Sequence, residues 1–244
     1  MRRYLLSAVS AIAVMGGASV ALAGPMQTLD FNGFTHGTDL SNFGAFSVGG
    51  GINVTVTDSE NGTGFENAFI FDTQNGSTPD DTDLQGDFEE VDSAGNVINT
   101  GIDLGNVLVL GTASGTCPSI ACSVNDTNTT GTIFFTFSVP VSFLAFKAVD
   151  TGDSNGVQVQ YFDAGNNLLA GPATLGMAPG DNQFETVSFA ATGATISSFA
   201  FTGSGAIDDI TFQQIPVPAT FGFLAFGAIL LGAAVGRKRS VDAS

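Results

Sequence analysis

Between residues 24 and 214 the sequence is built from short runs rich in Val, Ile, Phe and Thr, separated by Gly, Asn, Asp and Ser. Such runs are typical of β-strands bounded by turns, and no window of about ten residues has the periodicity of an amphipathic helix. We therefore predict an all-β fold, a single jelly-roll-like β-sandwich over residues 24–214. The predicted strands are residues 27–31, 52–57, 67–71, 106–110, 132–139, 142–149, 156–162, 183–189, 195–201 and 206–212.

Local patterns support these strands. Val157, Val159 and Tyr161 alternate with two glutamines, which predicts one buried face and one solvated face. Turn-forming residues at 163–166 predict a hairpin to Leu168, and Pro140 is expected to end one strand before the next begins. The abundant phenylalanines indicate a packed core rather than a sugar-stacking platform.

The first 23 residues are typical of a secretory signal peptide. Arg2 and Arg3 precede an apolar run, and Ala21 and Ala23 fit a small-residue cleavage site. A membrane anchor is the alternative, although the run is shorter than the ~20 apolar residues of a spanning helix. We expect signal peptidase to cut after Ala23.

Residues 215–244 combine a proline motif, a short apolar run at 221–235 and a basic cluster. The motif is Pro216, Val217, Pro218 and Ala219, and the cluster is Arg237, Lys238 and Arg239. The run is short for a stable transmembrane helix, and the positive-inside tendency would keep the cluster in the cytoplasm. These features predict a C-terminal sorting signal with transient membrane insertion, or else an ordinary anchor.

This tail resembles the PEP-CTERM sorting signals of Gram-negative bacteria. Val217 stands where the usual motif has Glu, which is closer to the Val-Pro-Leu-Pro-Ala variant. The resemblance implies that an exosortase-like membrane peptidase processes the chain near residues 216–218. It also implies export through the inner membrane to the cell surface or extracellular matrix, often together with exopolysaccharide.

The charge of the body excludes some partners. Of the 23 acidic residues all but Asp242 lie in the body, which leaves 22 against Lys147 alone and a formal charge of −21. Nucleic acid and anionic lipid are poor partners for such a surface, whereas divalent cations are good ones. The acidic residues can also serve solubility alone. The only two cysteines, Cys117 and Cys122, predict a disulfide in an exported chain.

A cluster of carboxylates follows the predicted strand at residues 67–71. Asp72, Asp80, Asp81 and Asp83 could supply oxygen ligands to a structural Ca²⁺ ion, although their spacing is not that of an EF-hand. A solvated loop without metal is the alternative.

Asp208 and Asp209 lie on the last predicted strand of the body. Adjacent strand residues face opposite sides, so one carboxylate should be buried and need a metal or backbone N–H groups. The IFDT…D-D-DL loop and the closing GSGAIDDITF strand resemble a group of exported bacterial β-sandwich proteins, most without assigned activity. Similar carbohydrate-binding sandwiches hold Ca²⁺ between their first and last strands, which implies that Asp30 meets Asp208 or Asp209 at one edge.

No residue constellation specifies a reaction, and we expect no enzyme. A catalytic triad would need His36, the only histidine, and the many acids identify no particular glycosidase pair. Two functions stay open. One is a structural or adhesive matrix protein stabilised by Ca²⁺, and the other is a module that binds exopolysaccharide. An exposed aromatic pair beside a polar groove would favour the second.

Overall fold

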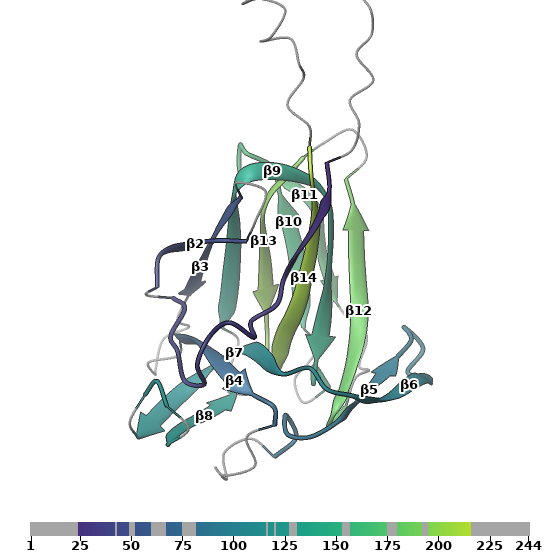
Figure 1. The fold of residues 1–244 in the computed structure, drawn as a ribbon. Coiled ribbons are helices and arrows are strands. Elements are labelled where there is room, and N and C mark those ends of the chain that lie inside the picture. The colour runs from purple at the N-terminus through teal and green to yellow at the C-terminus, as the bar shows by residue number, and fades with distance from the viewer. Residues whose placement is uncertain are drawn as a thin grey trace, which may run out of the picture. The chain divides into compact units, whose positions relative to one another are not determined.

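The computed structural model describes residues 24–215, except 42, 49–51, 60–66, 75–81, 116, 120, 127–130, 153–156, 175–179 and 192–194. These residues belong to one compact unit, Ala23–Ile215. The described part is all-β, with 14 strands joined by hydrogen bonds into one curled sheet (Figure 1). Within the described residues there is no helix long and apolar enough to span a membrane.

The sheet has two arms and a side branch. The first arm runs through β2 (Ala45–Ser47), β3 (Asn53–Ser59), the first half of β9 (Thr132–Val149), β13 (Ile196–Thr202), β10 (Gln158–Phe162) and β11 (Leu168–Thr174). The second runs through β1 (Met26–Leu29), β14 (Ala206–Gln214), the second half of β9, β12 (Gln183–Ala190), β5 (Phe88–Val91) and β6 (Val97–Ile102). The branch is β4 (Asn67–Asp72), β7 (Asn106–Gly115) and β8 (Cys122–Asp126), attached where β7 pairs with β14.

Strand β9 joins the two arms through an arch (Figure 1). Its ladder to β3 runs up to Phe137 and its ladder to β13 up to Thr136, and pairing to β13 and β14 resumes at Val141. We predicted two strands separated by Pro140, but the structure has one strand that bends there. The proline lies between the two stretches of pairing, so its missing N–H costs no ladder hydrogen bond.

The core is rich in phenylalanine and is drawn from both arms. Phe199 of β13 stacks on Phe135 with ring centroids 4.5 Å apart, and it lies 5.6 Å from Phe146 and 6.4 Å from Tyr161. The alternation predicted in β10 is present, because Val159 and Tyr161 are buried while Gln158 is exposed. A second buried cluster forms where the branch meets β5 and β12, around Phe71, Phe88 and Phe184.

Candidate functional site

An open groove of about 290 Å³ lies between the end of β1 and the β2 segment. Figure 1 shows β1 (purple) running beside β14 before the chain continues toward β2 and β3. The lining residues come from these two parts of the chain: Thr28, Leu29, Asp30, Gly33, Phe34, Phe46, Ser47 and Val48. The groove therefore combines aromatic, hydroxyl and carboxylate groups.

Phe34 and Phe46 form the aromatic side of this groove, and a third ring, Phe43, contacts Phe34 without lining the groove. Phe34 lies edge-on to Phe43 and to Phe46, with ring centroids 5.5 Å apart in each pair. Phe34 and Phe46 are half-buried against the core, whereas 55% of Phe43 is exposed. The core thus fixes two rings and leaves the third open to solvent, beside a hollow that a small ligand could enter.

The polar side carries hydroxyl groups and one carboxylate. Thr28 pairs with Thr211 across the β1–β14 ladder, and their hydroxyl oxygens are 2.9 Å apart. Asp30 follows directly after β1 and, like Ser47, is exposed. These groups can donate to and accept from a hydroxylated ligand while the rings cover its apolar face.

Behind Asp30, strand β14 contains a bulge. Its register against β9 shifts by one residue between Asp208 and Thr211, and Asp209 has a positive φ of 47°. Lys147 on β9 forms an ion pair with Asp209, with Nζ 2.6 Å from Oδ2. The single lysine of the body is therefore bound to the more exposed of the two aspartates.

Asp208 is the buried aspartate of the pair, only 1% exposed. Burial, followed by the negative charges of Asp209 and Asp30, raises its pKa to about 7, although the Asp209 N–H and Lys147 act in the opposite direction. Among the described residues its Oδ1 has no hydrogen-bond partner. One of the two adjacent carboxylates is thus buried, as predicted. β1 pairs with β14 up to Leu29 and Ile210, and the charge of Asp30 acts on Asp208, while a Ca²⁺ ion between these strands stays a prediction.

The predicted Ca²⁺ loop is only partly described. Asp72 ends β4, where its carboxylate accepts a hydrogen bond from the Gln74 N–H at 3.0 Å. The Gly86 N–H donates to the Thr73 carbonyl at 2.9 Å and so closes the base of the loop that contains Asp83. Asp80 and Asp81 lie outside the described residues. Within the described residues no three Asp, Glu, His or Cys side chains are grouped so that they could hold a metal ion.

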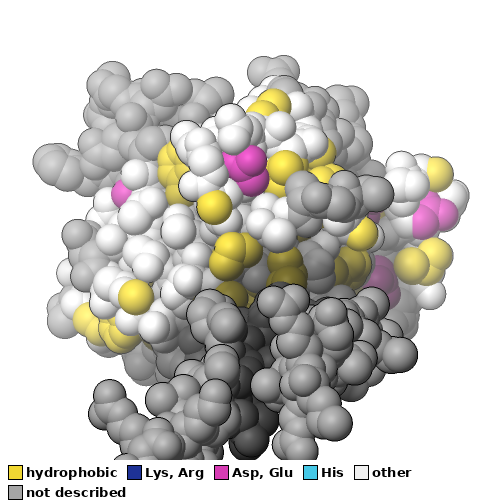
Figure 2. All heavy atoms as spheres, turned by 90° about the horizontal axis from the view of Figure 1, so that it is seen from above, with side chains coloured by type: hydrophobic (Ala, Val, Ile, Leu, Met, Phe, Trp, Pro, Cys, Tyr) yellow, Lys and Arg dark blue, Asp and Glu magenta, His cyan; other side chains and the backbone are white. Residues whose placement is uncertain are grey.

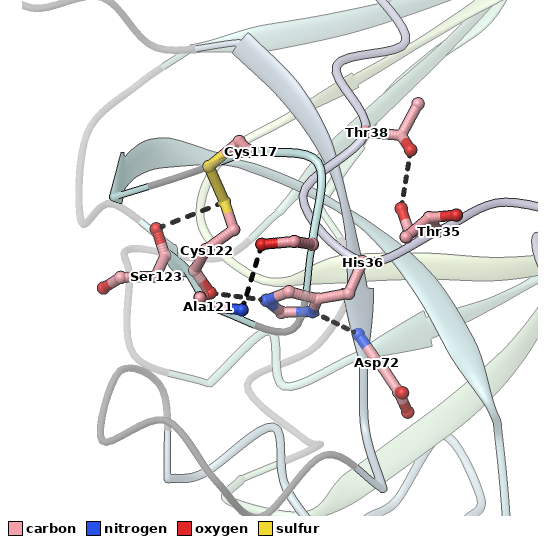
Figure 3. Close-up of a disulfide and its surroundings, with 9 residues drawn as sticks. Thr35, His36, Thr38, Asp72, Cys117, Ala121, Cys122 and Ser123 are labelled. Atoms are coloured by element: carbon pink, nitrogen blue, oxygen red, sulfur yellow. Dashed lines mark hydrogen bonds between the residues drawn. A yellow bond between two sulfur atoms is a disulfide. The ribbon is translucent and has the colours of Figure 1, made fainter.

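The disulfide and the only histidine form one structural unit (Figure 3). Cys117 is bonded to Cys122, the first residue of β8. His36 is buried, and its Nε2 lies 3.0 Å from the Cys122 carbonyl oxygen while its Nδ1 accepts from the Asp72 N–H at 3.0 Å. This pattern requires the neutral ring with its proton on Nε2, and it leaves neither nitrogen to activate a nucleophile.

Replacing His36 with phenylalanine should therefore destabilise the protein by about 2 kcal/mol, because the ring volume is kept but two main-chain groups lose their partner. Chemical denaturation of the oxidised protein at pH 7 measures the loss. An unchanged midpoint would show that water replaces the histidine at no cost.

The signals at the two ends of the chain lie outside the described residues. This applies to Ala21 and Ala23 and to the whole tail from Pro216. Export and sorting accordingly stay predictions from the sequence.

Sequence reasoning did not find the aromatic groove, because it assigned the phenylalanines to the core as a class. A local signal was present: Phe34, Phe43 and Phe46 lie in a segment interrupted by glycines, where no regular strand can bury them all. No protein-family model matches the chain, and comparison with curated proteins finds no similar sequence.

Proposed function

We propose that this chain is an exported surface protein that binds carbohydrate in the groove formed by Phe34, Phe46, Asp30 and Ser47. The observation that carries the proposal is the exposed Phe43 edge-on to Phe34 beside a polar hollow. Carbohydrates have apolar C–H faces and polar rims, so a site for them needs aromatic rings next to hydroxyl and carboxylate groups. The predicted signal peptide and PEP-CTERM-like tail would bring this groove to the exopolysaccharide outside the cell.

Within the all-β class we propose that the curled sheet forms a jelly-roll-like β-sandwich. It is supported by the arch of β9, which folds one arm of the sheet toward the other, and by a core to which both arms contribute. In such a fold the groove lies at an edge, where β1 ends and the chain continues to β2.

We propose binding without catalysis. Glycosidases use two carboxyl groups that flank the scissile bond. The residues that line the groove include one carboxylate, Asp30, while Asp208 behind it is fully buried.

A glycan array probed with the protein tests this function, followed by titration of the best ligand. Phe43→Ala should weaken binding about fivefold, since an aromatic contact contributes about 1 kcal/mol. Leu168→Ala is a matched control, because Leu168 is 48% exposed but lies on β11, at the opposite end of the first arm from β2, whereas Phe43 contacts the lining residue Phe34. An equal loss of glycan affinity in the two variants, or no binding of the wild type to any glycan, would count against the proposal.

A structural or adhesive role stabilised by Ca²⁺ is the second candidate. The observation that favours it is the closed base of the loop after β4, which carries Asp72 and Asp83, in a body of formal charge −21. A bound divalent ion would reduce the self-repulsion of such a body. The two roles are compatible, because a protein that holds polysaccharide also serves the matrix.

Millimolar Ca²⁺ should therefore raise the melting temperature by several degrees relative to EDTA at equal ionic strength. A free Ca²⁺ concentration of ~100 Kd adds about 2.7 kcal/mol to the free energy of unfolding. Asp83→Asn should remove most of this gain if the loop is the site, and should leave it intact if Asp208 and Asp209 bind the ion. An equal rise with Mg²⁺ would indicate general charge screening, and no rise would exclude the Ca²⁺ site.

A further inference from the structure

The groove has a negative electrostatic field. Its one charged lining residue is Asp30, which is exposed and accepts no hydrogen bond from any described residue. Asp30 is also close enough to Asp208 that its charge raises the pKa of that buried carboxyl. On the face shown in Figure 2, acidic and hydrophobic side chains of described residues lie among uncharged ones, and none of those visible is basic.

The one lysine of the body does not offset this field inside the groove. Lys147 Nζ lies 2.6 Å from Asp209 Oδ2 and 5.0 Å from the centroid of the Phe184 ring, and the lysine is not a lining residue. Its charge is therefore engaged on β9 and β14. A ligand that enters the groove meets a carboxylate and no cation among the described residues.

We propose that the groove selects saccharides that carry a free primary amine, with Asp30 as the residue that determines this specificity. This inference rests on the proposed function. A protonated sugar amine can donate a charge-assisted hydrogen bond to the Asp30 carboxylate. The face of Phe34 or Phe46 can accept the C–H face of the same sugar or its ammonium group. Uronic acids meet like charge and are rejected.

The size of the groove agrees with this ligand class. A volume of about 290 Å³ is at the low end of small-molecule sites, so it suits one or two sugar rings of a longer chain. One amine on one ring is then enough to reach Asp30. A longer cationic polymer without sugar rings would gain the charge attraction but not the fit to the aromatic rings.

The test is calorimetric titration of the protein at pH 6 with tetramers of glucosamine, N-acetylglucosamine and a uronic acid, and with tetralysine. We expect the glucosamine tetramer to bind up to about fivefold more tightly than the N-acetylated tetramer, because a solvent-exposed ion pair contributes up to about 1 kcal/mol. The uronic acid should not bind measurably. The preference should decrease with added salt, because the pair is solvent-exposed.

Asp30→Asn should abolish the preference for the amine and leave the affinity for the N-acetylated tetramer unchanged. Asp87→Asn is the control, because Asp87 is exposed and does not line the groove. Equal affinity for the amine and the N-acetylated tetramer in the wild type would overturn the specificity and leave carbohydrate binding intact. Binding of tetralysine as tight as that of glucosamine would overturn it by showing charge attraction alone. Failure of every saccharide to bind would overturn the proposed function as well.

Discussion

Replacing Asp208 with asparagine is expected to stabilise the protein above pH 7 and to flatten its stability profile between pH 4 and pH 7. The pKa of this carboxyl is raised from 3.8 to about 7 in the folded state, mainly by burial. Over that window the folded chain binds a proton that the unfolded chain has released, so the free energy of unfolding falls as pH rises. At pH 8 the cost of the buried charge is on the order of 4 kcal/mol, and the asparagine variant avoids it.

Urea unfolding of both proteins at several pH values in EDTA measures this effect. Asp209→Asn is the comparison variant. It removes a partly exposed ion pair with Lys147, which should matter by less than about 1 kcal/mol, and one of the charges that raise the pKa of Asp208, so it should weaken the pH dependence without removing it. An Asp208→Asn variant that is less stable than the wild type at pH 8 would contradict the account. Such a result would show that the ionised carboxylate has a partner that stabilises it.

Replacing Phe199 with alanine should destabilise the protein by about 3–5 kcal/mol, the range for large-to-small substitution in a packed core. Phe199 is fully buried, stacks on Phe135 with rings 4° from parallel, and also contacts Phe146 from the second half of β9. It therefore links the two halves of the strand that joins the arms. The loss should appear as a lower urea midpoint.

Phe43→Ala is the control for this substitution, because the same side chain is removed from an exposed position. Its stability should change by less than about 0.5 kcal/mol. If the two variants lost similar stability, Phe199 would not be part of a packed core and the arrangement of the two arms would be wrong.

Local patterns in the sequence were sufficient to predict the strands that have a buried face. The predicted range 67–71 became β4 (Asn67–Asp72), and 206–212 became β14 (Ala206–Gln214). Strands without that pattern were missed. β6 (Val97–Ile102) is exposed along nearly its whole length, and β2 and β5 are too short to show a period. β8 (Cys122–Asp126) follows the disulfide loop and was overlooked as a strand.

The site was less predictable than the strands, because long-range pairing creates it. Asp30 and Asp208 come together only because β1 pairs with β14, and this was anticipated from a resemblance rather than from the local sequence. A single sequence contains no signal for the bulge at Asp209 or for the ion pair between Lys147 and Asp209. Likewise, the glycine-interrupted segment around Phe34 and Phe46 indicates that not all of its phenylalanines are buried, but it does not show which of them line a groove.

The most direct test of carbohydrate binding is to fill the groove. Gly33 lines it, and a Cβ added there would meet no atom within 4 Å, so Gly33→Leu adds an apolar side chain at the groove without a clash of its Cβ with the fold. Titration of the tightest ligand from the glycan array into the wild type and this variant should show binding reduced at least tenfold, with the melting temperature unchanged. Unchanged affinity in a variant that folds normally would place the carbohydrate elsewhere and contradict the assignment of the groove.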